Sequence, residues 1–141
     1  MATTRNATTH WEGSLMEGSG NVSLESSNIG TYDVTWASRA EDPQGRTSPE
    51  ELIAAAHSAC FSMSLSHALA GAGTPPDALD TSAAVTFQPG EGITGVHLTV
   101  QGKVPGMSAE AFTEAAENAK VNCPVSKALT GTTITLDASL G

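Results

Sequence analysis

The sequence predicts an α+β fold, with mostly antiparallel sheets around one long buried helix that carries a cysteine. Three observations support this. Residues 48–71 have the start and stop signals of a single long helix. Segments on both sides of that helix alternate apolar and polar residues, as half-buried strands do. The expected elements follow the order βββ-α-ββ-α-β, and clustered strands with few helices favour antiparallel pairing.

The long helix is expected to begin after Ser48. Ser48 suits the N-cap, Pro49 suits the first helical position because its missing N–H needs no partner there, and Glu51 completes a capping box. No further proline or glycine occurs until Gly71, which suits the C-terminal stop. The interior has few charges and many small residues, so we expect burial on most sides. Cys60 lies near the middle, where either packing or chemistry could use its fixed position.

Three strands are expected before this helix. Residues 9–13 form a short edge strand, and a turn at 18–20 leads to a second strand at 21–26. The third strand places Tyr32, Val34 and Trp36 on one face. Residues 38–47 are polar and are expected to form a loop that leads to the long helix.

After the helix, residues 71–80 form a linker, and a hairpin turns at 89–92 between strands at 81–88 and 96–104. Ser108 caps a second helix whose apolar stripe continues to Cys123. A short helix follows with Pro124 at its first position, and residues 132–139 form the last strand.

Bulk composition is that of one globular domain over residues 1–141. Of its 141 residues, 39% are hydrophobic and 15% are charged. The net charge of −9 argues against a nucleic-acid partner, because few cations are present to neutralise phosphates. The first nine residues lack a signal-peptide pattern, and no apolar run approaches the roughly 20 residues of a membrane span. We therefore expect a cytoplasmic protein without a membrane partner.

Two cysteines, Cys60 and Cys123, are too far apart in sequence for a local C-x-x-C redox pair. Either one alone could be a small core residue. Cys123 immediately precedes the proline-initiated helix, where the helix dipole lowers the pKa of a thiol and favours the thiolate. Both the packing role and the reactive role stay open on this evidence.

Charged and imidazole side chains offer further candidates. Arg39 would be a solvated loop charge by itself, but beside a cysteine it would stabilise the thiolate. Glu50 and Glu51 lie in the first turn of the long helix, where carboxylates offset the dipole without any catalytic role. His57 and His67 fit core histidines better than bases. Neither C-x-x-C nor H-x-x-x-H spacing supports a zinc site.

Several motifs together resemble the OsmC subgroup of the OsmC/Ohr hydroperoxide reductases. The resemblance covers essentially the whole chain, in order. Its motifs are the H-W-E-G of residues 10–13, the S-P-E-E-L-I-A-A-A-H-S-A-C-F-S-M of residues 48–63, the N-C-P-V-S of residues 122–126 and the I-T-L-D of residues 134–137.

This resemblance implies an OsmC-like fold and a two-cysteine peroxidase that acts on organic hydroperoxides without a metal, haem or other cofactor. By position, Cys60 matches the peroxidatic cysteine and Cys123 the resolving cysteine. Arg39 matches the arginine that pairs with the thiolate, and Glu50 matches the acid that orients it. Because this loop varies in length within the family, Arg46 is the alternative arginine.

The resemblance also implies partners. The family forms intertwined homodimers with sites at the subunit interface, and an external dithiol reduces the disulfide. For the related Ohr branch that reductant is a lipoyl-bearing protein, and we extend this expectation to the present chain.

Glu50 and Cys60 are ten residues apart, or about 15 Å along one straight helix. Glu50 is therefore expected to act across the dimer interface.

Two other classes of function stay open. Cys60 could serve acyl transfer with His57 as base, although no third orienting group is apparent. Alternatively, the small-residue pocket could bind an apolar ligand with both cysteines inert. Consumption of a dithiol that depends on peroxide distinguishes the peroxidase from both.

Overall fold

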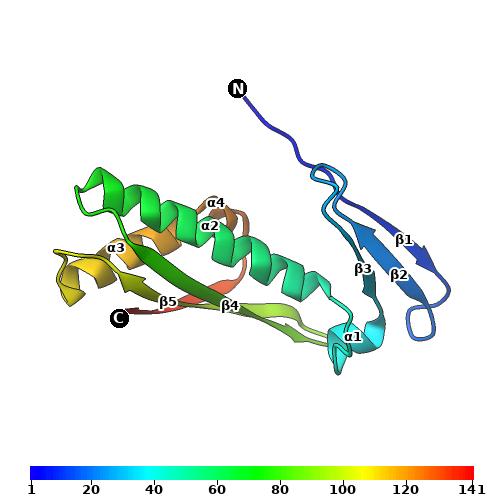
Figure 1. Cartoon of the computed structure of the whole chain (residues 1–141). Helices are drawn as coiled ribbons and strands as arrows, with labels where there is room; N and C mark the ends of the chain where they lie inside the picture. The colour runs from blue at the N-terminus through cyan, green and yellow to red at the C-terminus, as the bar shows by residue number, and fades with distance from the viewer. The chain divides into compact units, whose positions relative to one another are not determined.

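The structure is a computed structural model that describes all residues from Met1 to Gly141 (Figure 1). The chain divides into two compact units, Met1–Leu52 and Ile53–Gly141, called here the N-terminal and C-terminal units. Each is described separately, and the organisation of residues 1–141 as one domain stays a prediction. The element order confirms an α+β fold, with one short helix, Trp36–Ala40, in addition to the helices that the sequence predicts.

Three antiparallel strands form the sheet of the N-terminal unit: β1 (Thr8–Glu12), β2 (Ser19–Ser23) and β3 (Thr31–Val34), in that order. β2 begins earlier than predicted, because Gly20 pairs with Trp11 inside the sheet instead of forming a turn. A Cβ atom on Gly20 would lie 2.7 Å from the Trp11 ring, so only glycine fits opposite this side chain.

The predicted third strand is too long and the predicted loop after it is partly wrong. β3 ends at Val34, and Trp36–Ala40 forms the short helix α1. Thr35 caps it in a reciprocal pair: the Ser38 N–H donates to Thr35 Oγ1 and the Thr35 N–H donates to Ser38 Oγ, both at 3.0 Å. This local capping pair outweighs the alternation that favoured a strand.

The long helix α2 spans Pro49–Gly71, as predicted. The Glu51 N–H donates to Ser48 Oγ at 3.1 Å, which confirms the N-cap. The capping box is not closed as predicted, because the Glu51 carboxylate accepts a hydrogen bond from the Thr47 hydroxyl at 2.6 Å. The first turn of α2 belongs to the N-terminal unit and the rest to the C-terminal unit.

Burial of α2 on most sides is not seen in the single chain. Within the C-terminal unit its buried residues form one stripe, His57, Phe61, Leu65 and Leu69. The other faces are half-buried or exposed, and Met63 is 74% exposed. Contrary to the sequence-based expectation, α2 is long and apolar enough to cross a membrane by length and composition, with a mean hydropathy of 1.2. One such helix is weak evidence of a membrane span, because the core helix of a soluble protein passes the same test.

A second three-stranded sheet lies in the C-terminal unit, in the order β4 (Ala78–Gln88), β5 (Gly92–Lys103), β6 (Thr133–Leu140). β4 and β5 form the predicted antiparallel hairpin, whereas β5 and β6 are parallel. β4 begins before the predicted Thr81, since the alternation of half-buried and exposed residues already starts at its N-terminal end.

The core of the C-terminal unit lies between this sheet and the helices α2 and α3 (Ala109–Asn122), which Figure 1 shows on the same face of the sheet. The predicted stripe of α3 is confirmed and continues into Cys123. A five-residue helix α4 (Pro124–Ala128) follows, as predicted. The buried core residues are Phe61, Leu65, Leu69, Val96, Leu98, Val100, Val104, Phe112, Ala116, Ala119 and Cys123.

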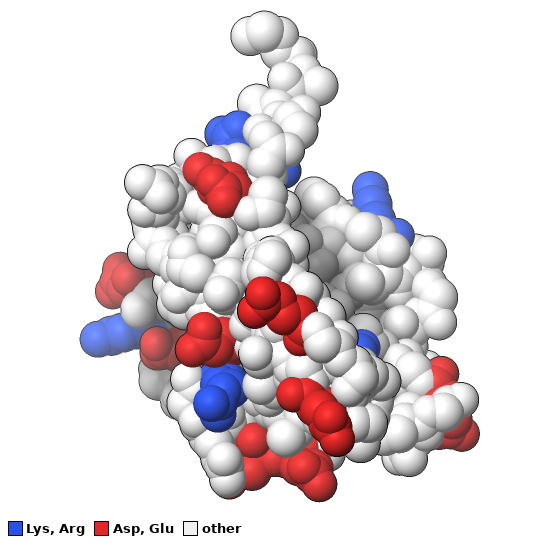
Figure 2. All heavy atoms as spheres, turned by 90° about the vertical axis from the view of Figure 1, so that its right-hand side faces the viewer, with Lys and Arg blue, Asp and Glu red and all other residues white.

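Surface charge agrees with the acidic composition. Acidic side chains cluster on the face shown in Figure 2, where basic side chains are scattered. The net charge of the chain is −9.

Candidate active site

Cys123 occupies the corner between two helices. Proline disfavours helical backbone in the residue before it, so Pro124 ends α3 at Asn122. Cys123 accordingly has an extended ψ of 127° while its N–H still donates to the Ala119 carbonyl at 2.9 Å. It is the C-cap of α3 and the N-cap of α4 at once. This corner gives the Cys123 side chain a fixed direction into the core.

Both cysteines meet in the C-terminal unit. The Sγ atoms of Cys60 and Cys123 lie 3.0 Å apart and share a hydrogen bond, although both residues are free thiols. Cys123 is fully buried and Cys60 is half-buried. The fold therefore places two thiols within reach of each other, with Cys60 the more accessible.

The first turn of α4 surrounds both sulfurs with donors. The backbone N–H of Val125 hydrogen-bonds to both cysteines, and the N–H and hydroxyl of Ser126 hydrogen-bond to Cys123. These N–H groups have no carbonyl partner inside the helix, so a sulfur atom is a natural acceptor for them. The hydroxyl of Ser64 on α2 adds a hydrogen bond to Cys60.

The two thiols differ in acidity. Burial is the largest influence on the pKa of Cys60 and raises it, and the hydrogen bond with Cys123 raises it further. Burial also acts to raise the pKa of Cys123, but its hydrogen bonds with Cys60, Ser126 and Val125 outweigh burial and lower the pKa. The lowered pKa of Cys123 agrees with the sequence-based expectation. No cation is among the groups that shift the pKa of Cys60.

Arg39 and Glu50 meet in the N-terminal unit. The Arg39 Nη2 atom lies 2.9 Å from Glu50 Oε2, and its Nε–H donates to both carboxylate oxygens at 3.1 Å. The Glu50 side chain is 8% exposed and the Arg39 side chain 31% exposed. A forked contact to a buried carboxylate fixes the plane of the guanidinium, so Glu50 orients Arg39.

Local structure explains why these two residues meet. Arg39 lies in the last turn of α1 and Glu50 in the first turn of α2. The Ser38 hydroxyl donates to the Thr47 carbonyl at 2.9 Å, and the Thr47 N–H donates to the Asp33 carbonyl at 2.9 Å. These bonds hold the segment between the two helices against β3 and bring the two side chains together.

An apolar cavity adjoins this ion pair within the N-terminal unit. Its volume is about 360 Å³, and its lining is mostly apolar with Arg39 as its one charged member. The lining residues are Thr9, Trp11, Leu15, Val22, Val34, Thr35, Trp36, Arg39, Pro49 and Leu52. Such a cavity suits a hydrocarbon group whose polar end faces a guanidinium.

Arginines occur only in the N-terminal unit, because residues 53–141 contain none. Arg46, the alternative partner for the thiolate, is exposed and lines a separate cavity of about 190 Å³ with His10, Glu12 and Asp33. Of the two candidates, Arg39 is the one that contacts Glu50.

His57 is a core histidine, as the sequence favoured. Its ring is fully buried, Nε2 lies 2.7 Å from Ser126 Oγ, and Nδ1 has no partner. Burial lowers its pKa. Because Nε2 hydrogen-bonds with a serine and Nδ1 has no hydrogen-bond partner, no cysteine–histidine pair forms of the kind that acyl transfer needs. His67 is exposed, and no group of three or more His, Cys, Asp or Glu side chains could hold a metal ion.

Ser126 is the site residue that sequence reasoning missed. The available signal was its place three residues after Cys123 in the C-P-V-S motif, which puts it in the first turn of the helix that Cys123 caps.

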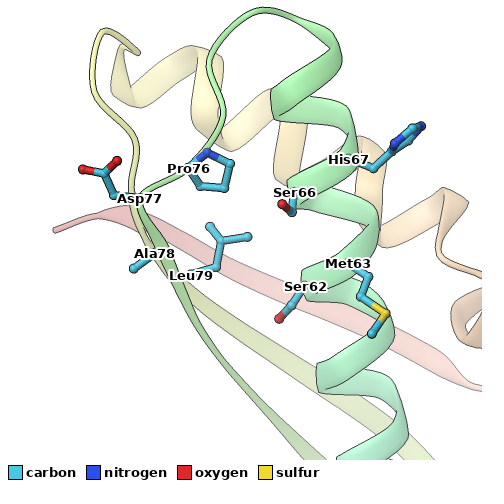
Figure 3. Close-up of a pocket in the computed structure, with 8 residues that line it drawn as sticks. All are labelled: Ser62, Met63, Ser66, His67, Pro76, Asp77, Ala78 and Leu79. Carbon is cyan, nitrogen blue, oxygen red and sulfur yellow. The ribbon is translucent and has the colours of Figure 1, made fainter.

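A groove of about 540 Å³ lies along α2 in the C-terminal unit (Figure 3). Ser62, Ser66, Met63 and His67 of α2 line it, with Ser62 and Ser66 directed toward Pro76 and Leu79. Neither cysteine lines this groove, so it is not the reactive site.

The chain is similar to known proteins over most of its length. Residues 41–137 match the family model described as OsmC, OsmC-like protein. The chain is 43% identical over 134 residues to Peroxiredoxin OsmC of Escherichia coli (strain K12), covering 93% of this chain and 92% of that protein.

Solved structures show the same fold. An organic hydroperoxide resistance protein OsmC from Legionella pneumophila matches with a TM-score of 0.73 at 20% identity, covering 100% of this chain and 98% of that one. The organic hydroperoxide resistance protein OhrB of Bacillus subtilis matches with a TM-score of 0.68 at 24% identity, covering 96% and 98%.

Proposed function

This chain belongs to the OsmC family, and from that premise we propose that it reduces organic hydroperoxides to alcohols through a Cys60 sulfenic acid that Cys123 resolves. The observation that carries the proposal is the 3.0 Å separation of the two Sγ atoms. Similarity to a peroxiredoxin over 93% of the chain supports the peroxidase class. The mechanism and the substrate are inferred from the chemistry of the side chains.

The first step is attack by the Cys60 thiolate on the terminal oxygen of the hydroperoxide. The O–O bond breaks as the S–O bond forms, and the alkoxide takes a proton and leaves as the alcohol. Sulfur is oxidised by two electrons and the peroxide is reduced by two. Cys60 suits this step because it is the more accessible of the two thiols.

The second step forms the disulfide. Cys123 attacks the sulfenic sulfur, an S–S bond replaces the S–O bond, and hydroxide leaves and becomes water. A thiol already 3.0 Å away can react before a second peroxide oxidises Cys60 further. An external dithiol then reduces the disulfide by exchange. A lipoyl-bearing protein and a cytoplasmic location stay predictions.

A cation must lower the pKa of Cys60 for the first step, because burial raises it. We assign this role to Arg39, oriented by Glu50, since the C-terminal unit contains no arginine. α2 is one uninterrupted helix, and ten residues of helix span about 15 Å. The simplest arrangement is a homodimer in which the partner subunit supplies Arg39 and Glu50 to the site of Cys60.

The open faces of α2 support a dimer. They carry small and apolar residues that are exposed in the single chain, of which Met63 is the most exposed. A second copy of the chain packed on these faces would give the burial that the composition of α2 predicts.

The apolar cavity beside Arg39 supports an organic hydroperoxide over hydrogen peroxide. A volume of about 360 Å³ accommodates an alkyl or aryl group, and the guanidinium at its wall can bind the peroxide oxygens. The same cavity also favours the second candidate, a protein that binds an apolar ligand with both cysteines inert.

One experiment separates these two functions. The purified protein is mixed with cumene hydroperoxide and dihydrolipoamide, and loss of dithiol is followed with and without peroxide. We expect consumption that depends on both peroxide and protein and that is abolished in Cys60→Ser. Unchanged consumption in Cys60→Ser, or none in the unmodified protein, would reject the peroxidase mechanism.

A further inference from the structure

The contact between His57 and Ser126 is not used by the mechanism described so far. It joins α2, which carries Cys60, to α4, which Cys123 caps. Both side chains are buried, His57 completely and Ser126 to within 4% exposure. A buried polar pair between two elements specifies their relative position, because either group alone would lose its hydrogen bond without gaining water.

The direction of the hydrogen bonds follows from the surroundings. The Ser126 hydroxyl donates to the sulfur of Cys123, and this bond lowers the pKa of that thiol. With the serine proton directed at the sulfur, the serine oxygen accepts from His57, and this assignment gives His57 the Nε2–H tautomer. Nδ1, which has no hydrogen-bond partner, is then the unprotonated nitrogen.

We propose that His57 and Ser126 are positioning residues for disulfide formation, in a hydrogen-bond chain that runs from His57 through Ser126 to Cys123. His57 Nε2–H holds the oxygen of Ser126, so the serine proton points at the Cys123 sulfur. The chain keeps Cys123 directed at Cys60 and ready as the nucleophile. This inference rests on the proposed function, since it concerns the second step of that reaction.

The step itself is balanced without a further reactant. Cys123 thiolate attacks the sulfenic sulfur of Cys60, the S–O bond breaks, and the departing hydroxide becomes water. His57 and Ser126 undergo no net chemical change. Their effect is on the rate of this step and not on the attack of Cys60 on the peroxide.

The test measures the two steps separately. One equivalent of cumene hydroperoxide is added to the reduced protein, samples are quenched with an alkylating agent, and sulfenic acid, disulfide and sulfinic acid are resolved by mass spectrometry. In Ser126→Ala we expect oxidation of Cys60 within about twofold of the unmodified rate and disulfide formation roughly tenfold slower. Excess peroxide should then give more sulfinic acid on Cys60. His57→Gln should act in the same direction.

Two matched controls test the specificity. Ser62→Ala removes the hydroxyl of a serine on α2. That hydroxyl hydrogen-bonds to the Ser58 carbonyl and the Thr81 hydroxyl. His67→Gln changes an exposed histidine of the same helix. Both should form the disulfide at the unmodified rate. A Ser126→Ala rate equal to that of Ser62→Ala would overturn the proposal.

A pH profile distinguishes positioning from a purely structural role. Once Cys60 is a sulfenic acid, Cys123 is the thiol of this pair that still titrates. Loss of the serine donor should move the pH dependence of disulfide formation to higher pH, because the thiolate is less stabilised. A slower rate with an unmoved profile would also overturn the hydrogen-bond chain.

Failure of the peroxidase function itself would give a different result. Diamide oxidises two thiols to a disulfide and is itself reduced to the hydrazine, so it tests the approach of Cys123 to Cys60 without a peroxide. A protein inert to cumene hydroperoxide, in which Ser126→Ala still slows diamide-driven disulfide formation, would reject the proposed function and retain the positioning role.

Discussion

The Sγ atoms of Cys60 and Cys123 lie 3.0 Å apart although 63 residues separate them in the chain. One thiol comes from the middle of a long helix and the other from the corner between two helices. Two thiols at this distance can form a disulfide once one of them is oxidised. The two residues differ in exposure, since Cys123 is fully buried and Cys60 half-buried.

Replacing Cys123 with serine should separate the two steps. The Cys123→Ser variant should reduce about one equivalent of hydroperoxide and then stop, with Cys60 left as sulfenic acid or higher oxides, because no second thiol is present to resolve it. Mass spectrometry after one and after several equivalents measures this. Sustained turnover of the variant at the unmodified rate with dihydrolipoamide would show that Cys123 is not the resolving thiol.

Replacing Arg39 should affect the first step. Burial raises the pKa of Cys60, and a nearby guanidinium lowers it, so Arg39→Ala should raise it again. At pH values below that pKa the thiolate fraction and the peroxide rate should fall by roughly tenfold. The measurement is the pH dependence of Cys60 alkylation by iodoacetamide, which should move to higher pH.

Arg46→Ala is the matched control for this experiment. Arg46 is exposed and does not contact Glu50 in the structure, so its loss should leave the profile in place. A shifted curve for Arg46→Ala beside an unchanged one for Arg39→Ala would transfer the role to Arg46.

Subunit mixing tests where Glu50 acts. An inactive Cys60→Ser chain and an inactive Glu50→Ala chain are combined and allowed to exchange subunits. If Glu50 serves the site of its partner, each mixed dimer contains one site with both native residues, and activity should return. Dimers verified as mixed by mass that stay inactive would place Glu50 and Cys60 of one chain in the same site.

Gly102 on β5 should be intolerant of any side chain. A Cβ atom there would lie 2.5 Å from Cζ of Phe112, whose ring is fully buried. Gly102→Ala should therefore lower the free energy of unfolding by about 1–3 kcal/mol, the usual cost of overpacking a core. Gly131→Ala, where a Cβ would meet nothing within 4 Å, is the control for chemical denaturation. Equal stabilities would contradict the packing of α3 on β5.

Buried His57 predicts a loss of stability in mild acid. Burial lowers its pKa, so the unfolded chain binds a proton at higher pH than the folded chain does. The stability that neutral, buried His57 contributes to the folded chain is fully present above the ordinary histidine pKa of about 6.5. It declines as the pH falls below that value. One such group contributes a slope of at most about 1.4 kcal/mol per pH unit. Denaturation of His57→Gln should show a smaller slope, whereas the exposed control His67→Gln should keep it.

Local chemistry made several features of the fold predictable from sequence. Ser48, Pro49 and Gly71 mark the ends of α2, and Pro124 sets both the end of α3 and the start of α4. The alternation in β4 predicted which residues face the core. α1 was missed because its capping pair, Thr35 and Ser38, lies inside a strand-like pattern. The motifs around both cysteines were sufficient to indicate the family.

Tertiary structure alone decided which side chains meet. No local rule brings Cys60 to Cys123, or His57 to Ser126, because each contact joins distant segments through the packing of α2, α3 and α4 on one core. The contact of Arg39 with Glu50 likewise depends on the hydrogen bonds that hold α1 beside the start of α2. The acidity of the two thiols follows from these contacts, since burial and hydrogen bonding are properties of the folded chain. The sequence by itself determined where the long helices begin and end. Packing determined which side chains meet and how acidic the two thiols are.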